Sequence, residues 1–204
     1  MTDTDLQPWT ERLEPAGFWI RAAARLIDWF VLMLVEIVVL LLLALFAGML
    51  EGITGRSGTE TYAAMTQSTF IGWIGGVVEI LCYHTFFEGV AGSTVGKRIL
   101  GLHVIGFDGT PVRFGQAFRR SAGFLVDALF FGAIGAGEMR ESPEKQRIGD
   151  RWGATRVVRR RSLPPELHPP AVEFFAALAA AVQVAFLVAV ATRVLGYLWH
   201  VRGA

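Results

Sequence analysis

The sequence predicts an all-α membrane protein: a small bundle of three or four hydrophobic helices with a short cytoplasmic β-hairpin. Composition is the first observation, because 53% of the 204 residues are hydrophobic, 18% are charged and the mean hydropathy is +0.46. These values are unusual for a small soluble domain. The second observation is segregation, since long apolar runs alternate with segments that hold most of the charges. The third is a lone cysteine, Cys82, which excludes an internal disulfide and a cysteine-based zinc cluster.

The first apolar run, Leu26 to Leu50, predicts a membrane span at about 22–50. A helix of this length measures about 37 Å, enough to cross a bilayer with some tilt. The run is too long for the apolar region of a signal peptide. The head of the chain, with Asp3, Asp5, Glu11 and Glu14, also lacks the basic character of a secretory signal. We therefore expect an uncleaved span that follows a cytoplasmic N-terminal tail, residues 1–15.

Two more runs predict spans, one at about 70–90 and an additional C-terminal transmembrane helix at 171–199. The run at 70–90 is interrupted by Glu79 and His84 and is marginal by itself. We expect it to pack against the first span, where its glycines permit close approach. A basic, proline-rich linker, 159–170, precedes the last helix.

Residues 121–137 are apolar, but the segment is short and contains Asp127. Basic residues flank it on both sides, and the positive-inside rule places both flanks in the cytoplasm. We expect an interfacial or re-entrant helix over 119–137. Asp127 is either on the wet face of this helix, which is favoured, or a fourth polar member of the bundle. A true crossing is the alternative, and it would return the C-terminus to the cytoplasm. The same rule puts the loop 51–69 outside and the N-terminus in the cytoplasm.

A small β element is expected on the cytoplasmic side, formed by residues 98–113 and 154–160. Asp108-Gly109 lies between two β-prone stretches, which predicts a hairpin turn. The stretch "ATRVVRR" (154–160) predicts a third strand.

The first span carries Arg21, Arg25, Asp28 and Glu36, and all four fall within about 80° of a helical wheel. Such a stripe is expected to face protein or water. The first three lie near the cytoplasmic end, where pairing and snorkelling reduce the cost of a charge. Glu36 lies near the predicted bilayer centre, where an acid is a functional candidate.

A candidate ion or proton path consists of Glu36, Glu79 and His84. If the two carboxyl groups meet inside the bundle, they are expected to share one proton. The alternative is a protonated carboxyl group that is hydrogen-bonded within the bundle. His84 and Glu88, four residues apart, are candidates for a proton relay or for a capping pair at the interface.

A set of basic residues is expected to contact anionic lipid headgroups: Lys97, Arg98, Arg159, Arg160 and Arg161. The stretch "GSTVGKR" is similar to a phosphate-binding loop. Its spacing is one residue short, however, and Arg98 stands where that loop has Ser or Thr. A nucleotide site is excluded.

Three ordered stretches, "GFWIRAAARLID", "GSTVGKRILGLHVIGFDG" and "QRIGDRWGATRVV", resemble the RDD family of bacterial membrane proteins. The resemblance covers about residues 16–158 and implies that Arg21, Asp28 and Asp150 are the family's motif residues. They are either a substrate or ion site or an interfacial clamp in which Asp150 docks onto Arg21 or Arg25. The clamp is favoured because all three lie at one membrane face. The family often has histidine before the last aspartate, and here the residue is Gly149.

The resemblance implies a multi-pass protein of the bacterial inner membrane with a role in transport, and sodium–proton antiport is attributed to some members. We expect a small-solute or cation/proton transporter that uses intramembrane acids. The alternative is a non-transporting accessory or scaffold protein whose basic cytoplasmic face binds a partner or anionic lipid. No nucleophile–base or metal constellation is visible, so we expect no enzyme, cofactor or metal. Partners are expected to be the bilayer and a second copy of the chain, because three or four helices are few for a pore; nucleic acid is not expected.

Overall fold

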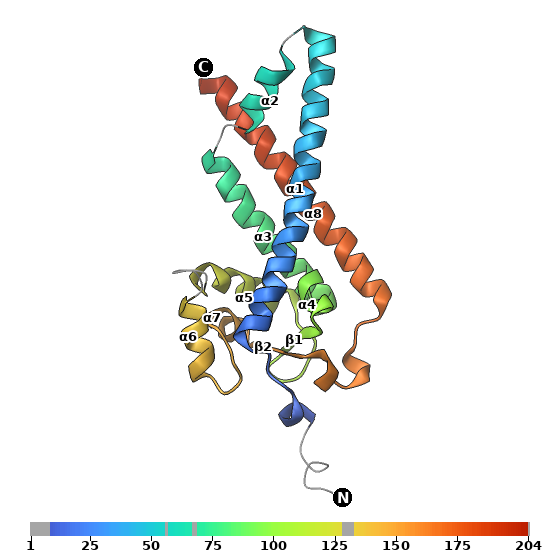
Figure 1. The fold of residues 1–204 in the computed structure, drawn as a ribbon, viewed down its shortest axis with the longest axis vertical. Helices are drawn as coiled ribbons and strands as arrows, with labels where there is room; N and C mark the ends of the chain where they lie inside the picture. Colours follow the sequence, from blue (N-terminus) through green and yellow to red (C-terminus); the bar gives the residue numbers. More distant parts are fainter. Residues whose placement is uncertain (1–8, 56, 67–68, 128–132, 204) are drawn as a thin grey trace, which may run out of the picture. The chain divides into compact units, whose positions relative to one another are not determined.

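The structure is a computed structural model that describes residues 9–55, 57–66, 69–127 and 133–203 (Figure 1). Most of these residues are helical, and the strands form one small sheet. The α-helices are α1 (Phe18–Thr54), α2 (Gly58–Thr66), α3 (Thr69–Ala91), α4 (Val95–Ile99), α5 (Phe114–Asp127), α6 (Ala133–Glu141), α7 (Ile148–Trp152) and α8 (Ala171–Gly203). The strands are β1 (Leu102–Gly106) and β2 (Thr155–Arg159), and the 3-10 helices are Trp9–Arg12, Arg160–Ser162 and Pro165–Leu167.

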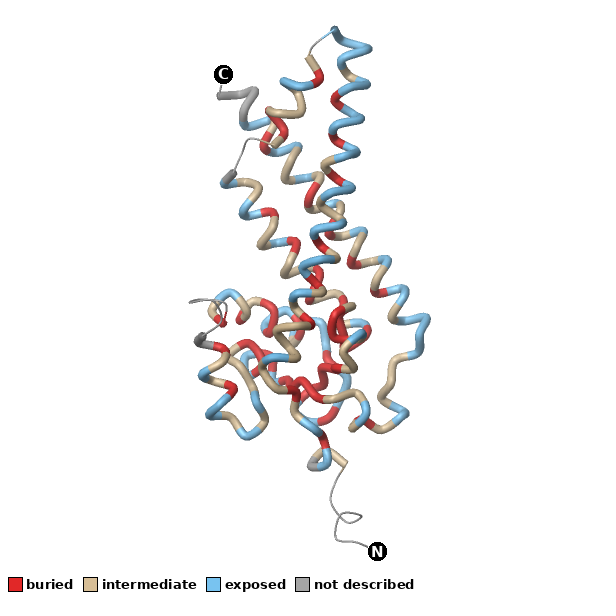
Figure 2. Tube along the Cα trace, in the orientation of Figure 1, coloured by how far each residue is buried: buried red, intermediate tan, exposed pale blue. Residues whose placement is uncertain are grey.

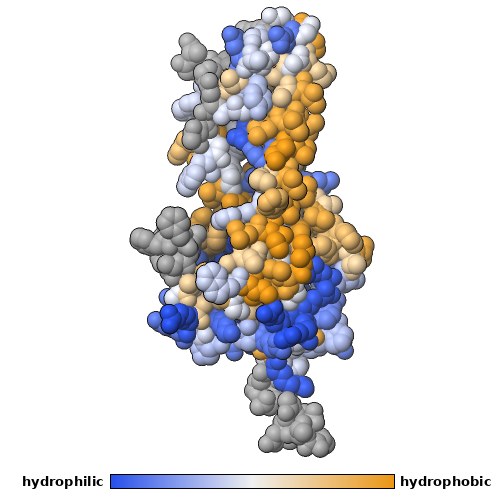
Figure 3. Space-filling model, in the orientation of Figure 1, coloured by the Kyte–Doolittle hydropathy of each residue, from blue (hydrophilic) through white to orange (hydrophobic). Residues whose placement is uncertain are grey.

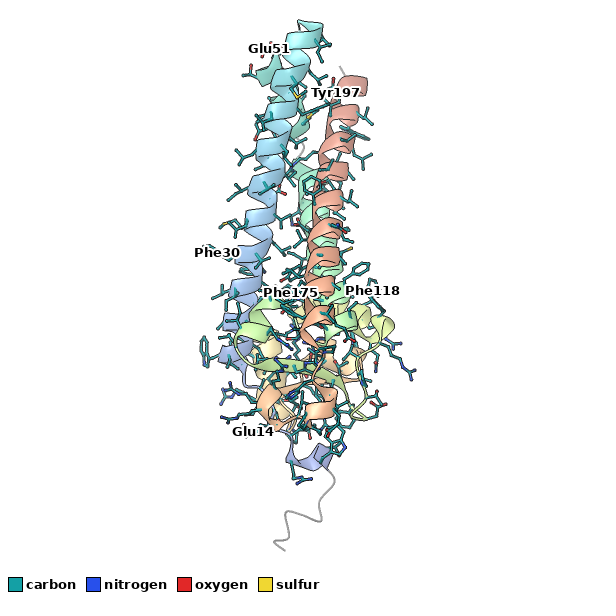
Figure 4. The ribbon with its side chains drawn as sticks, turned by 90° about the vertical axis from the view of Figure 1, so that its right-hand side faces the viewer. Glu14, Phe30, Glu51, Phe118, Phe175 and Tyr197 are labelled. Atoms are coloured by element: carbon teal, nitrogen blue, oxygen red, sulfur yellow. The ribbon has the colours of Figure 1, made fainter. Side chains whose placement is uncertain are left out.

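Within the described part of the chain, three helical stretches are long and apolar enough to cross a membrane: Phe18–Thr54, Phe70–Ala91 and Pro165–Trp199. Their large hydrophobic side chains are mostly exposed, and on the face drawn in Figure 3 such residues cover most of α1. Figure 4 shows Phe30 on the outer side of α1, where it is 64% exposed. Exposed apolar surface of this extent is expected to contact lipid rather than water. The predicted all-α membrane fold is confirmed.

The chain divides into two compact units, and each is described separately. The first unit comprises residues 1–29 and 84–180, and the second comprises 30–83 and 181–204. The long helices α1, α3 and α8 each contribute residues to both units.

The second unit is a packing of helices. Its core consists of Val39 and Leu43 from α1, Met65 from α2 and Ala189 from α8. Helix α3 approaches α8 through its glycines, since a Cβ at Gly75 would lie 2.5 Å from Cγ2 of Thr192. The expected close approach of α3 therefore exists, but it is made with the third span rather than the first. Thr192 is small enough to fill the groove that the glycine leaves.

The first unit holds the sheet and most of the buried residues (Figure 2). Strands β1 and β2 are antiparallel, with a register that runs from Leu102 opposite Arg159 to Gly106 opposite Thr155. Apolar side chains of both strands pack onto small residues of α1 and α5. This core comprises Ala16, Ala24, Leu102, Val104, Val112, Ala117 and Val157.

The expected antiparallel β element is present, but the pairing within it differs from the predicted hairpin. The Asp108-Gly109 turn forms, with Gly109 at a φ of 83° and its N–H donating to the carbonyl of Gly106 (3.0 Å). The second arm of the hairpin is wrong, because it is reduced to an isolated bridge between Ile105 and Pro111. Proline has no N–H to continue the ladder. The partner of β1 is β2, the stretch predicted as a third strand.

The segment predicted as an interfacial or re-entrant helix, 119–137, overlaps the C-terminal part of α5 and the N-terminal part of α6, and its residues 128–132 lie outside the described part of the chain. Helix α5 buries Arg120 and Asp127 and exposes Leu125 and Phe118. Phe118 is labelled in Figure 4. With 14 residues, α5 is about 21 Å long, which is short of a bilayer core. The expectation that Asp127 faces water is wrong, because the residue is only 3% exposed. Its carboxylate accepts hydrogen bonds from backbone N–H groups of α7, as described below.

Candidate functional site

The first unit contains a buried cluster of ion pairs centred on Asp150, in the first turn of α7. The Asp150 carboxylate is fully buried and forms ion pairs with Arg21 of α1 and Arg120 of α5. It also accepts a hydrogen bond from the backbone N–H of Arg147 (3.2 Å). Burial by itself would raise the pKa of Asp150, but the charges of Arg120 and Arg21 outweigh it and hold this pKa well below its usual range. Asp150 thus joins α1, α5 and α7.

Glu88, near the end of α3, extends this cluster to a fourth and a fifth helix. Its Oε2 accepts a hydrogen bond from Nε of Arg120 (2.6 Å), and its Oε1 forms an ion pair with Lys97 of α4. Burial lowers the pKa of Lys97 to about 7, although the charge of Glu88 acts in the opposite direction. Arg120 is 1% exposed, and the attraction of Asp150 and Glu88 raises its pKa despite its burial. The result is a continuous chain of contacts: Lys97, Glu88, Arg120, Asp150 and Arg21.

Asp28 connects α1 to the beginning of α4. Its carboxylate accepts hydrogen bonds from Oγ1 of Thr94 (2.7 Å) and from the backbone N–H of Gly96 (2.8 Å). Only glycine fits at position 96, because a Cβ there would overlap the carbonyl oxygen of Ala24 on α1. The glycine of the "GKR" stretch is therefore explained by a close crossing of two helices.

Asp127 binds the beginning of α7, which it reaches from the end of α5. It accepts from the backbone N–H groups of Ile148 (3.1 Å) and Gly149 (3.2 Å), and its Oδ2 lies 3.4 Å from Nε of Arg147. A Cβ at Gly149 would lie 2.5 Å from the carbonyl oxygen of Arg120. The histidine that the resemblance implies at this position would not fit between α5 and α7 in this chain.

The structure thus places two of the three motif residues, Arg21 and Asp150, in direct contact, and it places Asp28 in a separate contact with α4. Five basic residues are expected to face lipid headgroups, and for Lys97 this prediction is wrong. Lys97 is 6% exposed and forms an ion pair with Glu88. Arg161 is exposed and pairs with Glu14 (2.7 Å). For Arg98, Arg159 and Arg160 contact with headgroups stays a prediction.

The acids in the middle of the long helices belong to the second unit. Glu36 of α1 forms an ion pair with Arg193 of α8. Glu79 of α3 is 8% exposed, and its Oε1 makes no hydrogen bond to any residue that the structure describes. The charges of Glu36 and Arg193 both act on Glu79, and Nη1 of Arg193 would lie 3.1 Å from a Cβ at Gly72 on the same face of α3. The two glutamates and one arginine form a mid-helix group.

His84, the third residue of the predicted path, belongs to the first unit. Its Nδ1 lies 3.8 Å from Oε1 of Glu88. The structure therefore associates His84 with the buried ion-pair cluster, and the mid-helix group contains only the two glutamates of that path.

Sequence reasoning missed the roles of Arg120 and Arg193. In the sequence, Arg120 is one of the basic residues that flank the apolar segment 121–137, but in the structure its side chain forms ion pairs with Glu88 and Asp150. Arg193 stands in an otherwise apolar run, and a charge in such a run is expected to have a partner of opposite charge. That signal was available in the sequence, and Glu36 is the partner.

Among the described residues, no group of three or more His, Cys, Asp and Glu side chains is arranged to hold a metal ion. The ion pairs described above show charge pairing at both sites.

Comparison with known proteins identifies the family. The family model described as "RDD family" matches residues 15–154. This chain belongs to the RDD family. The match contains every residue of the ion-pair cluster, whereas Arg193 lies beyond it. The family is membrane-associated, in agreement with the three apolar helices.

A relative in Bacillus subtilis (strain 168), "Uncharacterized protein YxaI", is 28% identical over 159 residues. That alignment covers 71% of this chain and 97% of the relative. No solved structure matches this chain.

Proposed function

We propose that this RDD-family protein is a small proton-coupled transporter of the bacterial cytoplasmic membrane, with Glu79 as the group that binds and releases the proton. Glu79 itself is the observation that carries the proposal. It is a buried carboxyl group in the middle of an apolar helix, and its Oε1 has no hydrogen-bond partner among the described residues. Buried acids within spans are rare and are typically functional.

The charge of the mid-helix group supports exchange. Glu36 and Arg193 neutralise each other as an ion pair, so the ionised form of Glu79 leaves one negative charge. In a medium of low dielectric constant, that charge requires a proton or a small cation. Competition between the two at one carboxylate is the simplest form of coupled exchange. Of the two acids predicted for transport, Glu79 is therefore the one proposed to bind the transported proton or cation, and Glu36 positions Arg193.

The proposed topology is multi-pass with a cytoplasmic N-terminus, which the positive-inside rule supports. Helix α5 is proposed to lie at the membrane interface, since it buries the polar residues Arg120 and Asp127 and exposes Phe114 and Phe118. Three spans enclose little space, so transport is proposed to occur in a homo-oligomer.

The test is proton flux into liposomes that contain the purified chain, driven by gradients of sodium, potassium or lithium. Glu79→Gln is expected to abolish flux. The matched control is Glu173→Gln, because Glu173 is an exposed acid in the first turn of α8, and it should retain wild-type flux. Full flux in Glu79→Gln would refute the proposal.

A non-transporting accessory protein is the second candidate, and the ion-pair cluster is the observation that favours it. Asp150, Arg120 and Glu88 connect five helices of the first unit, which is the arrangement of a rigid platform. An absence of flux under every cation gradient, with correctly folded protein, would favour this candidate.

A further inference from the structure

A cavity of about 400 Å³ lies within the first unit, between the beginning of α1, the end of α5, α6 and the residue before α7. Its volume is in the range of small-molecule sites, about 300–1,000 Å³. Cationic and apolar side chains line it together: Arg21, Arg25, Arg147, Leu26, Trp29 and Phe124. Such a lining suits a ligand that has an anionic head and an apolar body.

The cavity is positively charged because its acidic lining residue, Asp127, is already bound by other groups of the protein. Asp127 is the carboxylate among the described lining residues, and it accepts two backbone hydrogen bonds from α7 and pairs with Arg147. Arg21 and Arg147 also contact Asp150. These contacts hold two guanidinium groups in place at the cavity wall.

Arg25 is a lining residue with a hydrogen-bond donor that is available to a ligand. Its Nη1 is buried and makes no hydrogen bond to any residue that the structure describes. Its Cζ lies 3.8 Å from the centroid of the Phe124 ring, so the guanidinium is stacked and held in one orientation. A buried donor without an acceptor is costly, and an anionic oxygen would satisfy it.

The exposed lining residues show where the cavity opens. Leu26 is 59% exposed and Trp29 is 48% exposed, and both belong to α1, a helix that is long and apolar enough to span the membrane. An acyl chain can therefore lie along α1 while its polar head enters the cavity. A tryptophan at such an opening is typical of the membrane interface.

We propose that this cavity binds the phosphate headgroup of an anionic membrane lipid. Arg25 donates a hydrogen bond to a phosphate oxygen, Arg21 and Arg147 add positive charge, and the acyl chain lies against Leu26 and Trp29. The site is in the first unit and does not depend on proton transport at Glu79.

The first test measures the unfolding temperature of the purified full chain in neutral detergent. Dioleoyl phosphatidylglycerol is expected to raise it in a saturable manner, whereas dioleoyl phosphatidylcholine and inorganic phosphate at equal concentration are not. Arg25→Gln should raise the phosphatidylglycerol concentration that gives half of the maximal stabilisation by about tenfold or more. This is the loss of affinity expected for one charge-assisted hydrogen bond. Arg113→Gln is the matched control, because Arg113 is exposed, does not line the cavity and is not among the residues expected to contact lipid headgroups.

The second test locates the acyl chain. Phosphatidylglycerol with brominated chains should quench tryptophan fluorescence more than brominated phosphatidylcholine does, and Trp29→Phe should remove the difference. Trp19→Phe, which changes an 82% exposed ring that does not line the cavity, should leave it unchanged. If Arg25→Gln does not fold, Trp29→Ala replaces it and is expected to weaken the phosphatidylglycerol effect.

Three results would overturn the proposal. Equal stabilisation by both lipids would show that no anionic head is recognised. The same stabilisation by inorganic phosphate would show a simple anion site. An unchanged response in Arg25→Gln or in its substitute, Trp29→Ala, would show that the cavity is not where the lipid binds.

Discussion

Replacement of Asp150 by asparagine removes one negative charge from the centre of the ion-pair cluster and keeps the shape of the side chain. Asp150 is fully buried and is shared by Arg21, Arg120 and Arg147. In the variant, Arg120 remains 1% exposed with Glu88 as its remaining ion-pair partner among the described residues. Removal of one partner of a buried ion pair costs about 3–5 kcal/mol, because the other charge stays buried. We expect the free energy of unfolding to decrease by that amount.

The assay is reversible unfolding of the full chain by SDS in mixed micelles, followed by helical circular dichroism. Glu138→Gln is the control, since it is also a carboxylate-to-amide change in an ion pair, with Arg151, but that pair is partly exposed. Exposed pairs contribute about 0–1 kcal/mol. The double variant with Arg120→Met should be less unstable than the sum of the single variants, by roughly 0.5–3 kcal/mol, because the two groups interact directly. Equal losses for Asp150→Asn and Glu138→Gln, or strict additivity in the double variant, would refute the reasoning.

Two further predictions concern the packing and the pH dependence of the first unit. Gly123→Ala should destabilise the protein by about 1–3 kcal/mol, because its Cβ would overlap the backbone of Gly149, whereas Gly115→Ala in the same helix meets open space and should be neutral or stabilising by up to about 1 kcal/mol. SDS unfolding of both variants checks this, and a Gly123→Ala variant as stable as Gly115→Ala would contradict the packing. Burial, with the charges of Arg160 and Arg98, lowers the pKa of His103 to about 3. Between pH 6.5 and about 3 the unfolded chain therefore binds a proton that the native state does not, and stability falls as pH decreases, by up to about 1.4 kcal/mol per pH unit. Unfolding temperatures at pH 7.5, 6 and 4.5 measure this slope, which His103→Gln should flatten; an equally steep slope in that variant would exclude His103 as its source.

Local patterns in the sequence were sufficient for the hydrophobic helices and for the turn at Asp108-Gly109, because hydrophobic length and turn chemistry depend on neighbouring residues. The resemblance to the RDD family grouped Arg21, Asp28 and Asp150, and the hydrophobic pattern marked Glu36 and Glu79 as acids within apolar helices. The second hairpin arm was wrong, since local β propensity could not show that β1 pairs with a strand about 50 residues later. The prediction that Lys97 contacts lipid headgroups was wrong for a similar reason. A stretch rich in Arg and Lys is expected at the surface, and no local pattern shows that Glu88 is the partner of Lys97.

By itself, the sequence determined that this protein is helical, that its long helices suit a membrane and which acids lie within its apolar helices, because these properties follow from composition and from hydrophobic length. Only the tertiary structure decided which charges meet. Arg120 lies between Glu88 and Asp150, Arg193 lies beside Glu36, and Arg25 stacks on Phe124 at the edge of a cavity. Each of these contacts joins residues that are far apart in the chain. Their geometry depends on where whole helices cross, as at Gly96, Gly123 and Gly149, and no local pattern specifies a crossing.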